Sequence, residues 1–62
     1  MSRTEVLEQV EQQVRNAKVR NPIQRYELAK ELIAQAYQAH GFVTSRLQIV
    51  HAANIMKART AR

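Results

Sequence analysis

Cysteine is absent from this sequence of 62 residues, and glycine and proline occur once each. The lack of cysteine excludes a disulfide framework. His40 and His51 lie eleven residues apart without a thiol or a nearby carboxylate, so we expect no metal site. Few glycines and prolines favour long helices, because these residues interrupt helices most strongly. A chain this short buries only about 60% of its unfolded surface, so oligomerisation, a bound partner or very close helix packing must add stability.

Long apolar runs and catalytic motifs are also missing. No segment approaches the roughly 20 apolar residues that span a bilayer, and the first 13 residues are polar in every turn, unlike a signal peptide. We therefore expect a cytoplasmic protein without a membrane span. The single glycine rules out a glycine-rich phosphate loop, and neither Ser2 nor Ser45 has a recognisable base and orienting acid. These absences predict no enzymatic activity and no cofactor.

Helix-start signals occur at two places in the first third of the chain. Ser2 and Glu5 fit the S-x-x-E capping box, in which each side chain accepts a hydrogen bond from the other residue's backbone amide. Asn21 is a good N-cap, and Pro22 suits the first helical position. Because the proline disfavours helical backbone at the residue before it, the first helix must end by this point.

A second break is expected at Gly41, which suits the left-handed cap at the end of a helix. Thr44 or Ser45 then caps a third helix. The sequence thus predicts a small all-α, three-helix domain whose second helix is central, because the apolar residues of that helix cover more than one stripe. The expected helices cover about residues 3–18, 22–40 and 45–58, followed by a frayed tail at 59–62.

The outer two helices carry narrow apolar stripes. The heptad-like stripe of the first helix comprises Leu7, Val10, Val14 and Ala17. The stripe of the third helix comprises Leu47, Val50, Ala53 and Met56. Ile49 flanks this second stripe and Ile55 lies off it, so the chain has more apolar surface than one small core can bury. The surplus predicts a homodimer interface or a protein partner.

Acidic residues are missing from the whole second half of the chain. The net charge is +5, and all five glutamates precede Leu32. The basic residues fall in two groups, Arg15, Lys18, Arg20 and Arg25 in the first half and Arg46, Lys57, Arg59 and Arg62 in the second. Positive charge distributed so unevenly favours a polyanionic partner, nucleic acid first.

The stretch around Gly41 resembles a helix-turn-helix motif, in which a glycine opens a three-residue turn and the following helix enters the major groove. With Gly41 as the turn glycine, four apolar positions of the motif are matched, by Ala36, Phe42, Leu47 and Val50. Tyr37 and His40 depart from the pattern, because the motif has a small residue and an apolar residue at these places. The resemblance covers roughly a third of the chain.

The resemblance implies that exposed residues early in the third helix face DNA. The candidates for contacts with bases are Arg46, Gln48, His51 and Asn54, because amides pair with adenine and arginine pairs with guanine. The candidates for phosphate contacts are Arg15, Lys18, Arg20, Arg25, Lys57, Arg59 and Arg62. These residues predict a small dimeric DNA-binding protein, acting as a transcription regulator or accessory factor, with DNA favoured over RNA.

A non-enzymatic helical protein-interaction module, such as an adaptor or inhibitor, is the alternative prediction. Such a module would bind a partner protein through an apolar helix face. The candidate interface residues are Leu7, Val10, Val14, Ile49 and Ile55. The surface itself distinguishes the two predictions, because a basic face favours DNA whereas an apolar groove favours protein.

Overall fold

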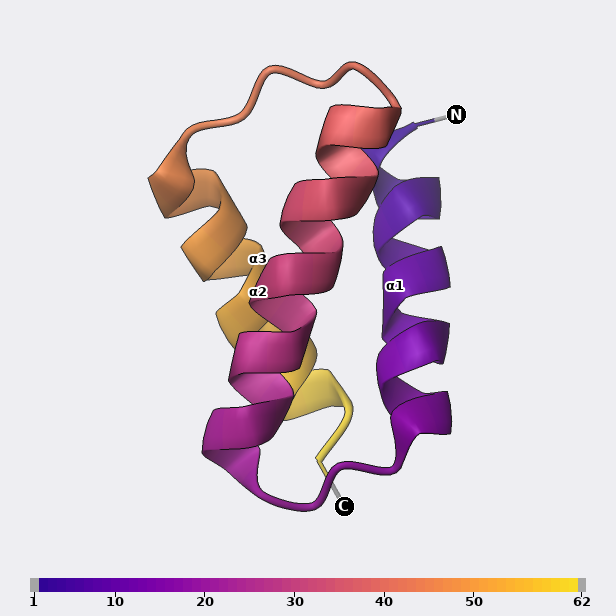
Figure 1. Cartoon of the computed structure of the whole chain (residues 1–62), viewed down its shortest axis with the longest axis vertical. Helices are drawn as coiled ribbons and strands as arrows, with labels where there is room; N and C mark the ends of the chain where they lie inside the picture. Colours follow the sequence, from indigo (N-terminus) through magenta and orange to yellow (C-terminus); the bar gives the residue numbers. More distant parts are fainter. Residues whose placement is uncertain (1, 62) are drawn as a thin grey trace.

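The computed structural model describes residues 2–61, which form three helices and no strand. The helices are α1 (Arg3–Ala17), α2 (Pro22–Ala39) and α3 (Arg46–Arg59). α1 and α3 run in the same direction, and α2 returns between them (Figure 1). Because α2 packs against both neighbours, the prediction of an all-α, three-helix fold with a central second helix is confirmed. The observed helix bounds differ from the predicted ones by at most one residue.

Side-chain caps fix where each helix begins. Ser2 Oγ accepts a hydrogen bond from the Glu5 amide at 3.2 Å. Asn21 Oδ1 accepts from the first two free amides of α2. Ser45 and Gln48 form a complete capping box, in which each side chain accepts from the other residue's amide. These bonds satisfy amides that have no partner inside the helix, so short polar sequences set the element boundaries.

The core contains eight apolar residues spaced mostly four apart along each helix. They are Val6, Val10, Val14, Ala29, Ile33, Tyr37, Ala53 and Met56. The predicted stripe of α1 is therefore displaced, because Val6 is buried and Ala17 is exposed. Val10 and Val14 were expected at a protein interface, and this prediction is wrong for both. Their side chains are almost fully buried within the chain's own core and cannot reach a partner.

The apolar stripe of α3 also differs from the prediction. Leu47 is 79% exposed, whereas Ile49 packs against the core. The cause is the helical period of about 100° per residue, which places Leu47 about 120° away from the buried Ala53 but Ile49 only about 40° away. Residues spaced three apart are each displaced by about 60° around the helix. After two such steps, from Ala53 back to Leu47, the side chain no longer lies on the buried face.

Six residues, 40–45, connect α2 to α3, in place of the three-residue turn of a helix-turn-helix motif. Gly41 takes the left-handed conformation that ends α2, with φ at 73°. The buried Tyr37 ring stands edge-on to the Phe42 ring at 5.6 Å between centroids. Tyr37 and Phe42 are both large, whereas a helix-turn-helix motif has a small residue at the position of Tyr37 so that its two helices can approach each other. Val43, in the same connection, is exposed.

The first two residues of the predicted frayed tail form hydrogen bonds, and fraying of 59–62 stays a prediction. Arg59 is the last residue of α3, and its carbonyl accepts a hydrogen bond from Arg15 Nη2 at 2.9 Å. Thr60 Oγ1 donates to the Met56 carbonyl at 2.8 Å. The bond from Arg15 satisfies a carbonyl at the end of the helix, whereas the Met56 carbonyl also accepts from the Thr60 amide at 2.9 Å. Arg62, the last predicted phosphate contact, lies outside the described residues.

Candidate nucleic-acid interface

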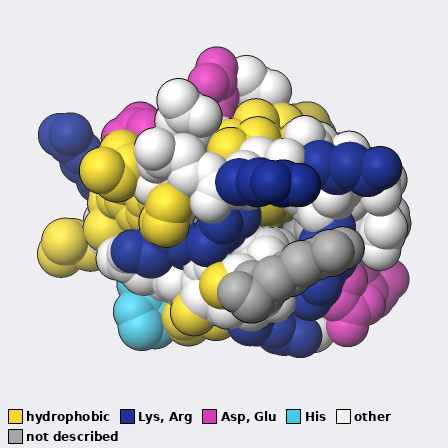
Figure 2. Space-filling model, turned by 90° about the horizontal axis from the view of Figure 1, so that it is seen from below, with side chains coloured by type: hydrophobic (Ala, Val, Ile, Leu, Met, Phe, Trp, Pro, Cys, Tyr) yellow, Lys and Arg dark blue, Asp and Glu magenta, His cyan; other side chains and the backbone are white. Residues whose placement is uncertain are grey.

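Two basic clusters that are far apart in the sequence meet at one end of the bundle. α1 ends there, the connection to α2 crosses it, and α3 ends beside it (Figure 1). Lys and Arg side chains spread over this end, and acidic side chains lie at its edges (Figure 2). We call this surface the basic end. Arg15, Lys18, Arg20 and Arg25 line it, and Lys57 and Arg59 belong to it because their carbonyls accept hydrogen bonds from Arg25 and Arg15.

Arg25 has a structural position inside the basic end. Only 8% of its surface is exposed. Its Nε and Nη2 donate to the Lys57 carbonyl at 3.3 and 3.2 Å, and its Nη1 donates to the Arg20 carbonyl at 3.2 Å. The last carbonyls of a helix carry partial negative charge and lack helical partners, so a buried guanidinium satisfies them well. The prediction that Arg25 contacts phosphate is therefore wrong, because the end of α3 already occupies its guanidinium.

Arg15 and Arg59 share one carboxylate, that of Glu11. Arg15 Nη2 lies 3.3 Å from Glu11 Oε2, and Arg59 Nε lies 3.0 Å from Glu11 Oε1. One negative charge balances one of the two guanidinium groups, so the trio remains positive. The side chains of Arg15 and Arg59 are 48% and 65% exposed. Their outer donor atoms are therefore open to a solvent anion.

Lys18 and Arg20 lie on the connection between α1 and α2, and both are exposed. The Lys18 backbone is left-handed, with φ at 54°, and its amide donates to the Arg15 carbonyl at 3.2 Å to close α1. Neither side chain forms an ion pair with any other residue in the range 2–61. Within the basic end, Lys18 and Arg20 are therefore the cations whose charges are most available to a ligand.

Lys57 belongs to a second group of cations, which the sequence did not suggest. Its Nζ lies 6.0 Å from the centroid of the Tyr26 ring, and Lys30 Nζ lies 5.5 Å from the same centroid. Lys30 also pairs with Glu27 at 3.2 Å. Tyr26 and Lys30 are one helical turn apart, a spacing that could have identified this pair. The approach of Lys57 depends on tertiary packing and could not have been read from the sequence.

The four residues predicted to read bases are all exposed on α3: Arg46, Gln48, His51 and Asn54. The structure places Arg46 far from the basic end, whereas Asn54 precedes Lys57 by only three residues. Arg46 begins α3 and Arg59 ends it, which separates the two by about 20 Å along the helix. The Gln48 side-chain oxygen already accepts from the Ser45 amide at 3.1 Å. Base reading by this set remains a prediction on a different part of the surface.

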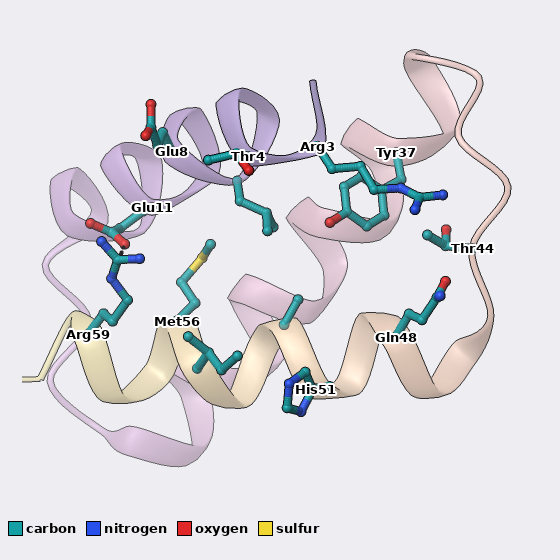
Figure 3. Close-up of a pocket in the computed structure, with 13 residues that line it drawn as sticks. Arg3, Thr4, Glu8, Glu11, Tyr37, Thr44, Gln48, His51, Met56 and Arg59 are labelled. Atoms are coloured by element: carbon teal, nitrogen blue, oxygen red, sulfur yellow. Dashed lines mark ion pairs between the residues drawn. The ribbon is translucent and has the colours of Figure 1, made fainter. Parts of the chain in front are cut away.

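A groove of about 470 Å³ runs between α1 and α3. Its apolar residues are Leu7, Tyr37, Ala52, Ile55 and Met56. Arg3 and Thr44 lie at one end, and Glu11 and Arg59 at the other (Figure 3). His51 lies at the outer edge of α3 in the same view. The groove is thus apolar in the middle and polar at its ends.

The groove contains two of the five predicted interface residues. Leu7 is half-buried and lines its α1 side, and Ile55 lines its α3 side with 46% of its surface exposed. Ile49 is half-buried and packs against the core, outside the groove. Tyr37 and Met56, which were not among the predicted interface residues, contribute buried side chains to the groove as well.

Comparisons with protein-family models, with curated proteins and with solved structures found no match. Within residues 2–61, no helix is long and apolar enough to cross a membrane. The same residues contain no group of three metal-ligating side chains. The two surface features described above, the basic end and the groove, are therefore the observations from which a function can be argued.

Proposed function

We propose that this chain is a small DNA-binding accessory protein that holds the phosphate backbone at its basic end. The observation that supports the proposal is the meeting of Arg15, Lys18 and Arg20 with Lys57 and Arg59 at one end of the bundle. Phosphate contacts need cations that are exposed and closely spaced, and they need no base-reading helix. The proposal differs from the sequence prediction in the surface used, not in the ligand.

Part of the positive charge at this end has another physical reason. α1 and α3 both end there, and the negative ends of two helix dipoles attract arginine side chains. That explanation accounts for Arg15 and Arg25, which donate to carbonyls of α3. Lys18 also lies at the end of α1, but its side chain and that of Arg20 form no hydrogen bond or ion pair with other described residues. The test therefore concentrates on these two residues.

The experiment is a titration with duplex DNA at several salt concentrations. Four exposed cations and the half-buried Lys57 suggest a log–log slope of about −4 for affinity against salt. The variant Lys18→Glu/Arg20→Glu should bind at least about tenfold more weakly at low salt, and its slope should be smaller by about 2. Its helix content and melting temperature should stay close to those of the wild type, because both residues are exposed.

A matched control changes a charge far from the basic end. The single variants Lys18→Glu and Arg46→Glu alter the net charge by the same amount. Only the first should reduce the salt slope. An equal loss from Arg46→Glu would overturn the basic-end assignment and favour presentation of α3. Absence of binding at about 50 mM salt would overturn the proposed function itself.

A further inference from the structure

Two lysines converge on the ring of Tyr26, which lies just after the first turn of α2. Lys30 Nζ lies 5.5 Å from the ring centroid, and Lys57 Nζ lies 6.0 Å from it. Lys30 comes from the next turn of α2, whereas Lys57 comes from the last turn of α3. The first turns of α2 lie beside the last turns of α3 (Figure 1). We call these three residues the tyrosine cluster.

The tyrosine cluster adjoins the basic end through Lys57, which belongs to both. The Lys57 carbonyl accepts from the Arg25 guanidinium at 3.3 and 3.2 Å, and its ammonium group lies near the Tyr26 ring. Lys30 lies about 12 Å along α2 from Pro22, the first residue of that helix. Positive charge therefore extends from the basic end onto the face that α2 and α3 share, and an aromatic ring lies along this path.

The packing of the chain itself explains only one of the two lysines. Lys30 follows Tyr26 by one helical turn, a spacing at which side chains meet, and it also pairs with Glu27 at 3.2 Å. Lys57 forms no ion pair with any other residue in the range 2–61. It adds a second positive charge beside the same ring, where like charges repel. An anion bound beside Tyr26 would neutralise both ammonium groups.

We propose that Tyr26 stacks an unpaired base of single-stranded DNA while Lys30 and Lys57 bind the phosphates beside that base. The inference rests on the proposed function, because the strand is the one held at the basic end. Sites for single strands combine a basic path for the backbone with an aromatic ring for a base. A base stacked on the ring is worth more than an exposed cation–aromatic contact, and each displaced lysine gains a phosphate. Tyr26 is half-buried and packs against the core, so its ring is positioned before a strand binds.

Stacking on Tyr26 predicts a preference that positive charge alone would not give. Duplex DNA has the higher charge density, so a purely basic surface binds it more tightly than a single strand. A base inside a duplex is paired and already stacked, so it cannot reach a tyrosine ring without leaving the helix. We therefore expect an oligothymidylate of about 12 nucleotides to bind at least about fivefold more tightly than a duplex of the same length. A duplex that binds as tightly as the single strand would overturn the inference.

Two replacements of Tyr26 separate stacking from packing. Tyr26→Leu keeps an apolar side chain against the core and removes the ring. Its affinity for the oligothymidylate should fall about tenfold, and its affinity for the duplex should not change. Tyr26→Phe is the matched control, because it keeps the ring and should bind the single strand like the wild type. Circular dichroism verifies the helix content of both variants. Stacking is excluded if Tyr26→Leu loses no affinity, or if Tyr26→Phe loses as much.

Tyrosine fluorescence tests the same contact without altering Tyr26. The chain has two tyrosines and no tryptophan, so Tyr26 is the only emitting side chain in the variant Tyr37→Phe, which keeps the buried ring at position 37. A thymine stacked on Tyr26 should quench this emission, whereas the duplex should leave it nearly unchanged. Emission that a saturating amount of oligothymidylate does not alter would contradict stacking on this ring.

Lys30→Gln tests the phosphate contact, because Lys30 lies outside the basic end. Its salt slope for the oligothymidylate should be smaller by about 0.7, the value of one contact on a single strand, and its duplex slope should not change. Arg46→Gln, at the other end of α3, removes the same charge and should leave both slopes unchanged.

The inference and the proposed function fail separately. Duplex binding that depends on Lys18 and Arg20, without any effect of Tyr26→Leu on the single strand, would remove the stacking contact alone. Equal single-strand slopes for Lys30→Gln and the wild type would contradict the contact at Lys30. Absence of binding to either form of DNA at about 50 mM salt would overturn both proposals.

Discussion

The basic end and the groove differ in how the chain satisfies its own chemical groups. At the basic end, Arg15 and Arg25 donate to carbonyls of α3, so side chains from two helices hold the third. Along the groove, α1 contacts the connection before α3 at one end and α3 itself at the other, and apolar surface stays open between these contacts. The end is thus rigidly built but carries excess charge, whereas the groove has little charge but incomplete packing.

This difference indicates which part of the surface depends on a partner for stability. Exposed charges are well solvated in water, so the basic end costs the free protein little. Open apolar surface forfeits the free energy of burial, about 25 cal/mol per Å², until something covers it. Variants at the basic end should therefore separate structural from binding roles, and the following three do so in order of decreasing effect.

Replacement of Arg25 should have the largest effect on stability. Arg25→Ala removes three hydrogen bonds from a buried guanidinium and leaves the Lys57 and Arg20 carbonyls with fewer partners. We expect the free energy of unfolding to fall by about 3 kcal/mol. That is a large share of the stability of a domain this small, since proteins have about 0.05–0.15 kcal/mol per residue. Urea unfolding followed by circular dichroism measures the change.

Arg25→Met is the control for this prediction, because it keeps the aliphatic stem and removes only the charged head. It should recover a small part of the loss. Leu7→Ala, on the half-buried wall of the groove, should cost the monomer about 1 kcal/mol. If Leu7→Ala destabilises the monomer more than Arg25→Ala does, then the groove and not the basic end holds the helices together.

The fold could be predicted because its signals are local. Ser2, Asn21 and Ser45 cap the three helices through contacts within three residues. The buried faces were less predictable, since a stripe drawn at a spacing of three residues drifts around the helix and misplaced Leu47. The six-residue connection could not be derived either, because it depends on how Tyr37 and Phe42 pack together.

Replacement of Lys18 should change stability and binding in opposite directions. Lys18 has left-handed backbone geometry, with φ at 54°, which costs a residue with a Cβ atom about 1 kcal/mol. Lys18→Gly should therefore raise the free energy of unfolding by about 1 kcal/mol, since glycine is the preferred residue at this kind of cap. The same change removes one exposed cation and should reduce the salt slope for DNA by about 1.

Lys18→Asn separates the two effects, because asparagine tolerates the left-handed conformation and carries no charge. It should bind DNA like the glycine variant while gaining less stability. Thermal melting and salt titration give both values for each variant. Unchanged DNA binding in Lys18→Gly would show that this lysine contacts no phosphate and that its position has no functional reason.

The candidate site was only partly predictable, for a reason that the basic residues illustrate. The sequence identified both clusters but not that Arg15 and Arg59 share Glu11, because the two arginines are 44 residues apart. Sequence reasoning also treated every cation as equally exposed, whereas Arg25 is buried. Composition predicts that the surface is positively charged. Only the packing of α3 against α1 and α2 shows which arginine and lysine side chains remain exposed to a ligand.

Replacement of Glu11 should have the smallest effect on stability, and it connects the two regions. Glu11 joins α1 to α3 at one end of the groove and neutralises part of the basic end. Glu11→Gln keeps the shape of the side chain and removes its charge. The free energy of unfolding should fall by less than about 1 kcal/mol, because both arginines are largely solvated. DNA affinity at low salt should rise by about threefold, since two guanidinium groups lose their competing anion.

Glu31→Gln is the matched control for Glu11→Gln, because Glu31 is exposed on α2 and forms no ion pair with other described residues. Both variants change the net charge by the same amount. If the basic end contacts phosphate, only Glu11→Gln should raise the affinity. Raised salt should reduce this difference in affinity, because salt screens exposed charges that lie farther apart than about 10 Å at 0.1 M. Equal gains from both variants would mean that net charge alone attracts DNA and that the arrangement of Arg15 and Arg59 around Glu11 contributes nothing to binding.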